Sequence, residues 1–367
     1  MAVLHENQSL EQIAQRLHGL REEIHAQCQL IARELDKADR MNRPAIFAAQ
    51  TRITHQIHQL RQLIPQFDAA YHAAGETLEV DGDARQIRPP DWLAFSAQVG
   101  LMRNWANGWN TVQARISEQC PPRRRSLEYQ REKAGPVHTA ALDAADRTMA
   151  QLLCVLAPNQ PSAATGRAGY GTQTGLSQSE FMALALACWR VLKAQDRHER
   201  TRFLDVGCGV GLQVLSALQF FDEAYGLERD PDCAQAARDL FSNAGAPKAG
   251  VLEGEARNFA SYDMFDAIHI CLPLKASREL RELEDYVIAS ARPETLLIVG
   301  HAGFAPRAEA LGCARLSTRL YLTGTAPRKA TSLRRKAELI GTNVTPESTP
   351  LRSVWEPILQ ASRRRGY

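Results

Sequence analysis

The stretch Arg202-Phe203-Leu204-Asp205-Val206-Gly207-Cys208-Gly209-Val210-Gly211 decides the fold, because an apolar run ends there in an acid and three alternating glycines. Phe203, Leu204 and Val206 are typical of a buried parallel strand. Residues 212–221 carry apolar side chains at helical spacing, which predicts a helix after the turn. The glycines let the backbone turn sharply and let a ligand approach without a Cβ in the way. In an open α/β sheet, such a turn predicts a nucleotide site.

The glycine spacing decides which nucleotide is expected. Dinucleotide sites use Gly-x-Gly-x-x-Gly and place a pyrophosphate on the following helix. Here the third glycine comes one residue early and position 212 is Leu, which disfavours a phosphate. The form Asp-x-Gly-x-Gly-x-Gly resembles motif I of the class I S-adenosylmethionine (SAM) methyltransferases. In that family the turn passes under the methionine part of SAM, and the acid at the strand end helps to place its ammonium group. The resemblance therefore implies a SAM site at Asp205, Gly207, Cys208, Gly209 and Gly211.

A second acid follows at the end of the next predicted strand. Residues 224–228 form a short apolar run that ends in Glu228, 17 positions beyond Gly211. A carboxylate there can accept two hydrogen bonds from a ribose diol, more strongly than a neutral side chain can. This is the second signature of the family, and it implies that Glu228 and the adjacent Arg229 belong to the cofactor site.

A third acid lies where the family has its next strand and an acid that faces the adenine amine. Residues 251–256 read Val-Leu-Glu-Gly-Glu-Ala. Glu255 matches that position best because it follows Gly254 in the family's glycine-acid order, and Glu253 is the alternative. The resemblance thus adds Gly254, Glu255 and Ala256 to the predicted SAM contacts.

The segment before the glycine turn contributes two more candidates. Gly169-Tyr170-Gly171-Thr172 leads through Ser177 into an apolar helix over 181–192, and Ser177 with Glu180 forms a capping box. The arrangement resembles the segment before motif I in protein isoaspartate methyltransferases, and the Tyr-Gly segment of the non-SET histone-lysine methyltransferases. Both resemblances imply that Tyr170 and Ser177 cover the SAM carboxylate. A flexible linker followed by a well-capped helix is the alternative.

The acceptor side of the cleft is predicted after a strand over 265–270. Cys271 and the residues up to 274 are expected to line it, but they match neither the pocket of DNA-amine methyltransferases nor that of the histone-lysine enzymes. Two histidines are candidate general bases. His269 lies within the strand, where packing under a helix is the alternative, and His301 follows a further strand over 295–299.

Composition and cysteine usage limit the remaining classes. A chain of 367 residues is expected to form about two domains, and its net charge of +3 implies no polyanionic partner. The eight cysteines contain no Cys-x-x-Cys pair, which argues against a zinc site or a disulfide framework, so no metal is expected. The N-terminus lacks a leader pattern and no apolar run is long enough to span a bilayer. A cytoplasmic location is therefore expected.

Apolar residues before position 157 recur at steps of three and four. They predict one helix from Ser9 to Leu35 and a second over 46–71, joined by a short break over 40–44. A short connection forces neighbouring helices to reverse, so the two form an antiparallel hairpin. Further helices are predicted over 92–116 and 137–156.

Four segments are therefore predicted. They are a helical N-terminal domain (1–157), a linker or cofactor-covering loop (158–175), a SAM-binding domain of the α/β class with a Rossmann-like seven-stranded methyltransferase sheet (176–326), and a basic C-terminal tail (327–367). The tail is rich in Arg and Lys and suits an acidic partner or plain solvation. The helices suit a homodimer interface or a lid.

Three functions follow from the resemblance. The first is a SAM-dependent methyltransferase that modifies a protein side chain, favoured by the isoaspartate-like and lysine-enzyme-like features and by a large helical module. The second is a methyltransferase that acts on a small molecule. The third is a SAM-fold scaffold without turnover, against which Asp205, Glu228 and the intact glycines count.

Overall fold

The structure, a computed structural model, describes residues 2–76, 90–128, 135–156, 176–197, 200–270, 277–344 and 353–367. The chain divides into two compact units. A helical unit comprises Met1–Arg123 together with Thr345–Tyr367, and a sheet-bearing unit comprises Arg124–Val344. In chain order, the sheet-bearing unit is thus inserted between two parts of the helical unit.

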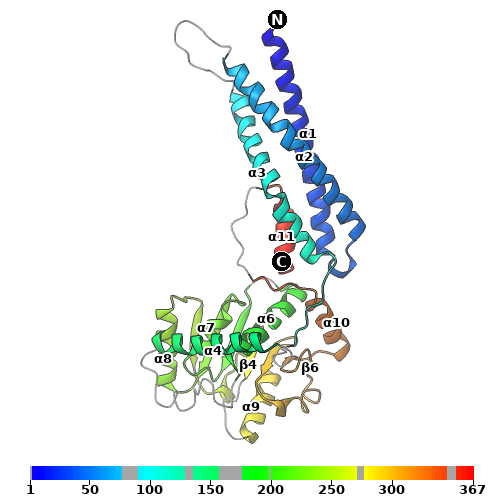
Figure 1. Ribbon diagram of the computed structural model, residues 1–367. Coiled ribbons are helices and arrows are strands. Elements are labelled where there is room, and N and C mark those ends of the chain that lie inside the picture. The colour runs from blue at the N-terminus through cyan, green and yellow to red at the C-terminus, as the bar shows by residue number, and fades with distance from the viewer. Residues whose placement is uncertain are drawn as a thin grey trace. The chain divides into compact units, whose positions relative to one another are not determined.

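The helical unit is built on three long helices, α1 (Ala2–Asp36), α2 (Arg43–Glu76) and α3 (Pro90–Gln119), with α11 (Glu356–Arg364) packed against α1 and α3 (Figure 1). The predicted seam of α1 is its buried face, since Leu17, Ile24 and Ile31 are fully buried. The helix begins at Ala2 and not near Ser9, because residues 2–8 contain no Gly or Pro to end it.

The predicted reversal between α1 and α2 is confirmed by their side-by-side packing. A 3-10 turn, η1 (Ala38–Arg40), connects the two helices. Asn42 then begins α2, because its Oδ1 accepts a hydrogen bond from the backbone N–H of Ala45 at 3.1 Å. The Glu34 carboxylate at the end of α1 accepts from the backbone N–H of Asn42 at 2.9 Å. These two bonds close the turn.

The structure differs from the expectation of a basic tail over 327–367. The segment contains α10 (Pro327–Ala337) in the sheet-bearing unit and α11 in the helical unit. Trp355 stacks near Trp109 with ring centroids 5.0 Å apart, and Ile358 is fully buried. The Gln119 side chain also donates a hydrogen bond to Ser362 Oγ at 2.7 Å. Apolar residues between the charges therefore give this segment a packed face.

The sheet-bearing unit contains the predicted seven-stranded sheet. Its strands are β1 (Arg202–Val206), β2 (Glu223–Glu228), β3 (Ala249–Glu253), β4 (Ala267–Ile270), β5 (Leu296–Val299), β6 (Ala314–Arg315) and β7 (Leu320–Leu322). Their order is β3-β2-β1-β4-β5-β7-β6, and β7 is antiparallel to both neighbours. This confirms the Rossmann-like methyltransferase sheet predicted from the sequence. The two-residue strand β6 is too short to produce a sequence pattern.

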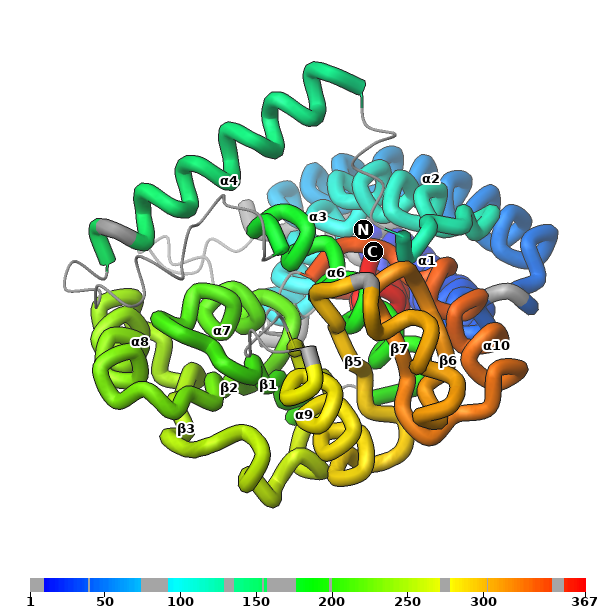
Figure 2. Tube along the Cα trace, turned by 90° about the horizontal axis from the view of Figure 1, so that it is seen from below, coloured from blue at the N-terminus to red at the C-terminus, as the bar shows by residue number. Residues whose placement is uncertain are grey.

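Helices cover both faces of the sheet (Figure 2). One face packs against α6 (Gln178–Ala194), α7 (Leu212–Ala217), α8 (Pro231–Asn243) and α10, and the other packs against α9 (Ser277–Ser290) with the 3-10 turns η3 (Ala256–Asn258) and η4 (Tyr262–Met264). Alternate residues of β1 serve the two cores: Phe203 faces the first group and Leu204 faces the second.

Helix α4 (Pro136–Leu156) belongs to the sheet-bearing unit and not, as expected from the sequence, to an N-terminal helical domain over 1–157. It packs against α6 and α8. The Asp146 carboxylate accepts from the backbone N–H of Ser179 at 2.7 Å, and the Asn243 amide donates to the carbonyl of Leu156 at 2.8 Å. These polar contacts between distant residues explain why sequence alone did not place α4.

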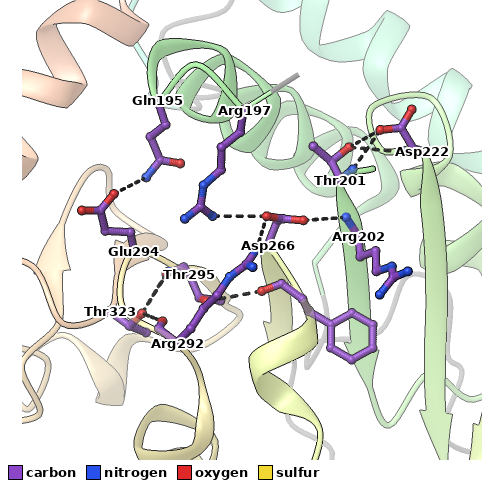
Figure 3. Close-up of polar contacts among 11 residues, drawn as sticks. Gln195, Arg197, Thr201, Arg202, Asp222, Asp266, Arg292, Glu294, Thr295 and Thr323 are labelled. Atoms are coloured by element: carbon purple, nitrogen blue, oxygen red, sulfur yellow. Dashed lines mark hydrogen bonds and ion pairs between the residues drawn. The ribbon is translucent and has the colours of Figure 1, made fainter. Parts of the chain in front are cut away.

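A polar cluster around Asp266 ties together the amino ends of the central strands (Figure 3). Asp266 accepts from the backbone N–H of Arg202 at 2.8 Å, from the Arg197 guanidinium at 3.2 Å and from the Arg292 guanidinium. This edge of the sheet is opposite the edge that carries the glycine turn, since the strands concerned are parallel. Asp266 therefore acts on the fold and not on the site.

In the ranges that the structure describes, no helix has both the length and the apolar character needed to cross a bilayer.

Candidate functional site

The glycine turn connects β1 to α7 at the carboxyl edge of the sheet. Gly207, Gly209 and Gly211 have φ angles of 74°, 53° and 84°, a region that favours glycine. The backbone N–H of Gly207 donates to the carbonyl of Leu227 at 2.8 Å, which continues the β1–β2 ladder into the turn. The turn is thus fixed to the neighbouring strand.

Two of these glycines serve different purposes. A Cβ on Gly211 would lie 2.7 Å from the Phe241 ring and 3.1 Å from Cβ of Ala237, so a side chain there would push α7 and α8 apart. A Cβ on Gly209 would have no described heavy atom within 4 Å. Gly211 therefore permits close helix packing, whereas Gly209 presents its backbone to open space where a ligand can approach.

Cys208 packs beneath the turn. Its Sγ would lie 2.3 Å from a Cβ on Gly226, so the two residues fit only because position 226 is glycine. Burial, with the nearby charges of Asp205 and Glu228, raises the pKa of the Cys208 thiol well above its ordinary value. The side chain is therefore a neutral packing group, and only its backbone can meet a ligand.

Glu228 ends β2 and faces the turn. Its Oε2 accepts from the backbone N–H of Gly209 at 2.9 Å, and its Oε1 accepts from the backbone N–H groups of Arg229 and Asp230 at 2.9 Å each. These three bonds leave one lone-pair site, on Oε2, because a carboxylate offers about four, two on each oxygen. Glu228 thus shapes the turn and can still accept a hydrogen bond from a diol.

Glu255 follows β3, at the same edge of the sheet as Glu228. Its carboxylate lies 3.3 Å from the Arg229 guanidinium and 3.7 Å from that of Arg257. Burial alone would raise the pKa of Glu255, but the hydrogen bonds from the Arg229 side chain and the Arg257 backbone, with both guanidinium charges, outweigh it and lower the pKa. Glu255 is therefore an ionised acceptor. The alternative acid, Glu253, pairs instead with Arg238 on α8.

The residues around Glu255 hold the β3 end in place. The backbone N–H of Gly254 donates to the carbonyl of Glu228 at 3.0 Å. The Tyr262 hydroxyl donates to the carbonyl of Ala256 at 2.8 Å. The predicted contacts at 254–256 therefore lie at the same sheet edge as Glu228.

Asp205, the acid of the glycine motif, is paired with His269. The two residues are register partners on β1 and β4, and Nδ1 of His269 lies 2.8 Å from Oδ1 of Asp205. Asp205 is 4% exposed and His269 is 2% exposed. His269 is therefore packed beneath α6, as the second of its two sequence interpretations expected.

Ser177 begins α6. Its Oγ accepts from the backbone N–H of Glu180 at 3.3 Å, which is the predicted capping bond. Gln178 donates to Ser216 Oγ on α7 at 2.6 Å, so the start of α6 is tied to the helix that follows the glycine turn. Tyr170 and Cys271 lie outside the described residues.

His301 lies at the carboxyl edge of the sheet, beyond β5. The backbone N–H of the preceding residue, Gly300, donates to the carbonyl of Ile270 at 3.0 Å, which aligns the ends of β4 and β5. Nε2 of His301 lies 2.5 Å from Glu284 Oε1 on α9, and the Arg307 guanidinium lies 2.6 Å from Oε2. The Glu284 side chain is fully buried, whereas that of His301 is 20% exposed.

Sequence reasoning missed Glu284 and Arg307. Leu280, Leu283, Glu284 and Val287 occupy positions i, i+3, i+4 and i+7 of one helix, so an acid stands in the apolar stripe of α9. A charged residue within the apolar stripe of a helix was the sequence signal available for Glu284, because a buried acid needs a partner. Arg307 carries no comparable signal.

Comparison with solved structures finds partial likenesses to methyltransferases. SAM-bound CalS10, an amino pentose methyltransferase from Micromonospora echinaspora, is 23% identical over 38% of this chain and 55% of its own, with a TM-score of 0.29. An RNA methyltransferase from Salinibacter ruber in complex with S-adenosyl-L-homocysteine is 19% identical over 30% of this chain and 72% of its own, with a TM-score of 0.25. PKMT2 from Rickettsia typhi in complex with AdoHcy is 17% identical over 32% of this chain and 25% of its own, with a TM-score of 0.28.

This chain spans about half the length of CalS10. No protein-family model and no curated protein matches the sequence. The fold is therefore assigned from the strand order and the glycine turn. From Arg202 to Leu322, the chain has the fold of the class I SAM-dependent methyltransferases.

Proposed function

We propose that this chain is a SAM-dependent methyltransferase. The observation that carries the proposal is the position of three acids around one open glycine turn: Asp205 is the next-to-last residue of β1, Glu228 ends β2 and Glu255 follows β3. Because β3, β2 and β1 are adjacent and parallel, their carboxyl ends meet at one edge of the sheet. Two of these acids suit the ribose diol and the adenine amine, and the third suits an ammonium group.

The residues present fit SAM better than a dinucleotide. The open space above Gly209 gives a ligand access to the backbone, and Glu228 keeps one unused lone-pair site on Oε2. Leu212 stands where a phosphate-binding turn would continue. When bound, SAM would supply a methyl group activated by a sulfonium charge. The contribution of the chain is to bind SAM and to align an acceptor with it, and alignment lowers the barrier by removing orientational freedom.

A protein side chain is the acceptor that we propose. Besides the sheet-bearing unit, the chain has a separate helical unit with its own buried core. A surface of that size suits a macromolecule. A small-molecule acceptor is the alternative.

His301 is the group that we propose as the proton acceptor. Its Nε2 is held by Glu284, and no described residue hydrogen-bonds to its Nδ1. In the tautomer that donates from Nε2–H to the carboxylate, Nδ1 carries the free lone pair. Nδ1 would take a proton from the acceptor, and Glu284 would stabilise the resulting imidazolium.

Two partner proposals remain from the sequence. Arg328, Arg335 and Lys336 are exposed on α10 and suit an acidic partner, although three cations bind only weakly.

The N-terminal helices suit a homodimer interface, which light scattering of the purified chain tests directly. A mass of one chain at every concentration excludes the homodimer.

Incubation of the protein with methyl-radiolabelled SAM and a cell lysate, followed by size separation, tests the function. Label in a protein band supports the protein acceptor, and label confined to small molecules supports the alternative. Binding of SAM in calorimetry without any transfer supports a non-catalytic SAM-fold scaffold. A chain that binds neither SAM nor S-adenosylhomocysteine is not a SAM-dependent methyltransferase.

A further inference from the structure

We propose that His269 is a positioning residue of the cofactor site, which holds the carboxylate of Asp205 so that its second oxygen can receive the ammonium group of SAM. This inference rests on the proposed function, since it concerns the same cofactor. It assigns a role to a histidine that is too buried to act on an acceptor. Its exposed fraction is 2%.

One carboxylate oxygen of Asp205 has a hydrogen-bond partner among the described residues, and the other oxygen has none. Oδ1 lies 2.8 Å from Nδ1 of His269, and no described residue donates a hydrogen bond to Oδ2. A buried carboxylate with an unused oxygen is costly unless a donor or a cation meets it. Asp205 stands two residues before Gly207 in the turn, and an ammonium group at the site would satisfy that oxygen.

The surroundings of His269 restrict its ring to one orientation. The ring centroid lies 5.3 Å from that of Phe181 on α6 and 6.5 Å from that of Phe203 on β1. Ile298 is its register partner on β5. These three neighbours are apolar, and among the residues that the structure describes Asp205 is the charged group placed against Nδ1. A ring clamped in this way cannot rotate to release the carboxylate.

Without His269, the carboxylate would be free to change rotamer. That change weakens a charge-assisted hydrogen bond to a ligand ammonium. The contacts of Glu228 and Glu255 with the nucleoside part would not change, because these acids lie on the other side of β1 in the sheet order. The loss is therefore specific to the amino-acid end of the ligand.

Two probes separate this role from a merely structural one. S-adenosylhomocysteine carries the ammonium group, whereas 5′-methylthioadenosine keeps the adenine, ribose and thioether and lacks the amino-acid part. Affinities of both are measured by calorimetry for the full chain and for His269→Phe, which keeps an aromatic ring between Phe181 and Phe203 but removes Nδ1. Tyr262→Phe is the matched control, since it removes a hydrogen bond at the adenine side, to the carbonyl of Ala256.

We expect His269→Phe to weaken the affinity for S-adenosylhomocysteine about tenfold or more, which is the effect of one charge-assisted hydrogen bond. The affinity for 5′-methylthioadenosine should change less than about twofold. His269→Asn, whose amide can stand in for Nδ1, should restore most of the loss. Tyr262→Phe should change the affinities for both ligands by the same factor. Equal weakening of both ligands by His269→Phe, or no weakening of either, overturns the inference.

Failure of the proposed function gives a different result, in which the unchanged chain binds neither probe. If His269→Phe does not fold, Asp205→Asn provides the second measurement. It retains the shape of the side chain and removes the charge, so it must show the same selectivity for the ligand that carries the ammonium group. An Asp205→Asn chain that binds S-adenosylhomocysteine as tightly as the unchanged chain contradicts the inference as well.

Discussion

Nδ1 of His269 lies 2.8 Å from Oδ1 of Asp205, in a pair that joins β4 to β1 at the carboxyl edge of the sheet. Both side chains are almost completely buried, so neither can exchange this partner for water. Removal of one partner leaves the other as a buried polar group without its bond, which costs more than the bond itself contributes. The two residues should therefore behave as one energetic unit.

A double-mutant cycle tests that unit. We expect Asp205→Leu and His269→Phe each to lower the free energy of unfolding by about 1–3 kcal/mol, because each leaves a buried polar partner unsatisfied. The double variant should lose less than the sum by about 1 kcal/mol or more. Urea unfolding, with the transition of the sheet-bearing unit fitted separately, measures the coupling. Strictly additive losses would show that the pair is not coupled.

The two glycines of the turn should respond in opposite ways. Gly211→Ala places a Cβ 2.7 Å from the Phe241 ring at a φ of 84°, so we expect it to lower the free energy of unfolding by about 1–3 kcal/mol. Gly209→Arg meets open space and should keep most of the stability, since only its φ of 53° is unfavourable. It should nevertheless abolish SAM binding by filling the turn. Unchanged affinity of Gly209→Arg in calorimetry contradicts the site.

Asp266 should affect stability without affecting ligand binding. Asp266→Asn weakens the contacts to Arg197 and Arg292 and to the backbone N–H of Arg202, so we expect a loss of about 1–3 kcal/mol. The affinity for S-adenosylhomocysteine should stay within about twofold, because Asp266 lies at the amino end of β4. Thermal unfolding and calorimetry on the same sample check both parts. A tenfold loss of affinity would place Asp266 in the site.

The parts of the site that could be predicted from sequence are local. The glycine turn and the acids Glu228 and Glu255 lie at fixed offsets from strand ends, and the chemistry of a ribose diol or an adenine amine requires such residues there. The Asp205–His269 pair could not be predicted in this way. It depends on the register between two strands that are 64 positions apart, and a shift of one residue would turn His269 to the other face.

The fold shows the same division between local and distant information. Most helices and strands of regular spacing were predicted to within a few residues, because apolar periodicity reports the buried face directly. The exceptions are α1, which begins at Ala2 and not near Ser9, and α7, which ends at Ala217 and not at 221. The placement of α4 and α11 was not, because it depends on contacts such as Asp146 with Ser179 and Trp109 with Trp355. Such contacts join residues far apart in the sequence. A single sequence does not report them.

The stability of the helical unit should fall at high pH. Burial raises the pKa of the Cys28 thiol from 9.0 to about 12, so the folded chain keeps a proton that the unfolded chain releases above pH 9. The stabilising contribution of this proton is fully present below pH 9 and is lost as the pH rises toward 12, at about 1.4 kcal/mol per unit. Urea unfolding from pH 8 to 10.5 should show this slope. In Cys28→Ala the slope should be shallower, and an identical slope contradicts the assignment.

The Glu284–His301 contact yields the sharpest test of the proposed base. His301→Asn removes the proton acceptor, and Glu284→Gln removes the charge that stabilises the imidazolium of His301. We expect each variant to lower the rate of methyl transfer roughly a hundredfold. Affinity for S-adenosylhomocysteine should be unchanged in both variants, because the cofactor acids lie on other strands. Glu282→Gln is the matched control, since its half-exposed side chain on the same helix pairs with Arg278. The acceptor is the species labelled by radioactive SAM. If the rate of His301→Asn equals that of Glu282→Gln, His301 is not the base, and the 2.5 Å contact with Glu284 serves only to anchor the end of β5.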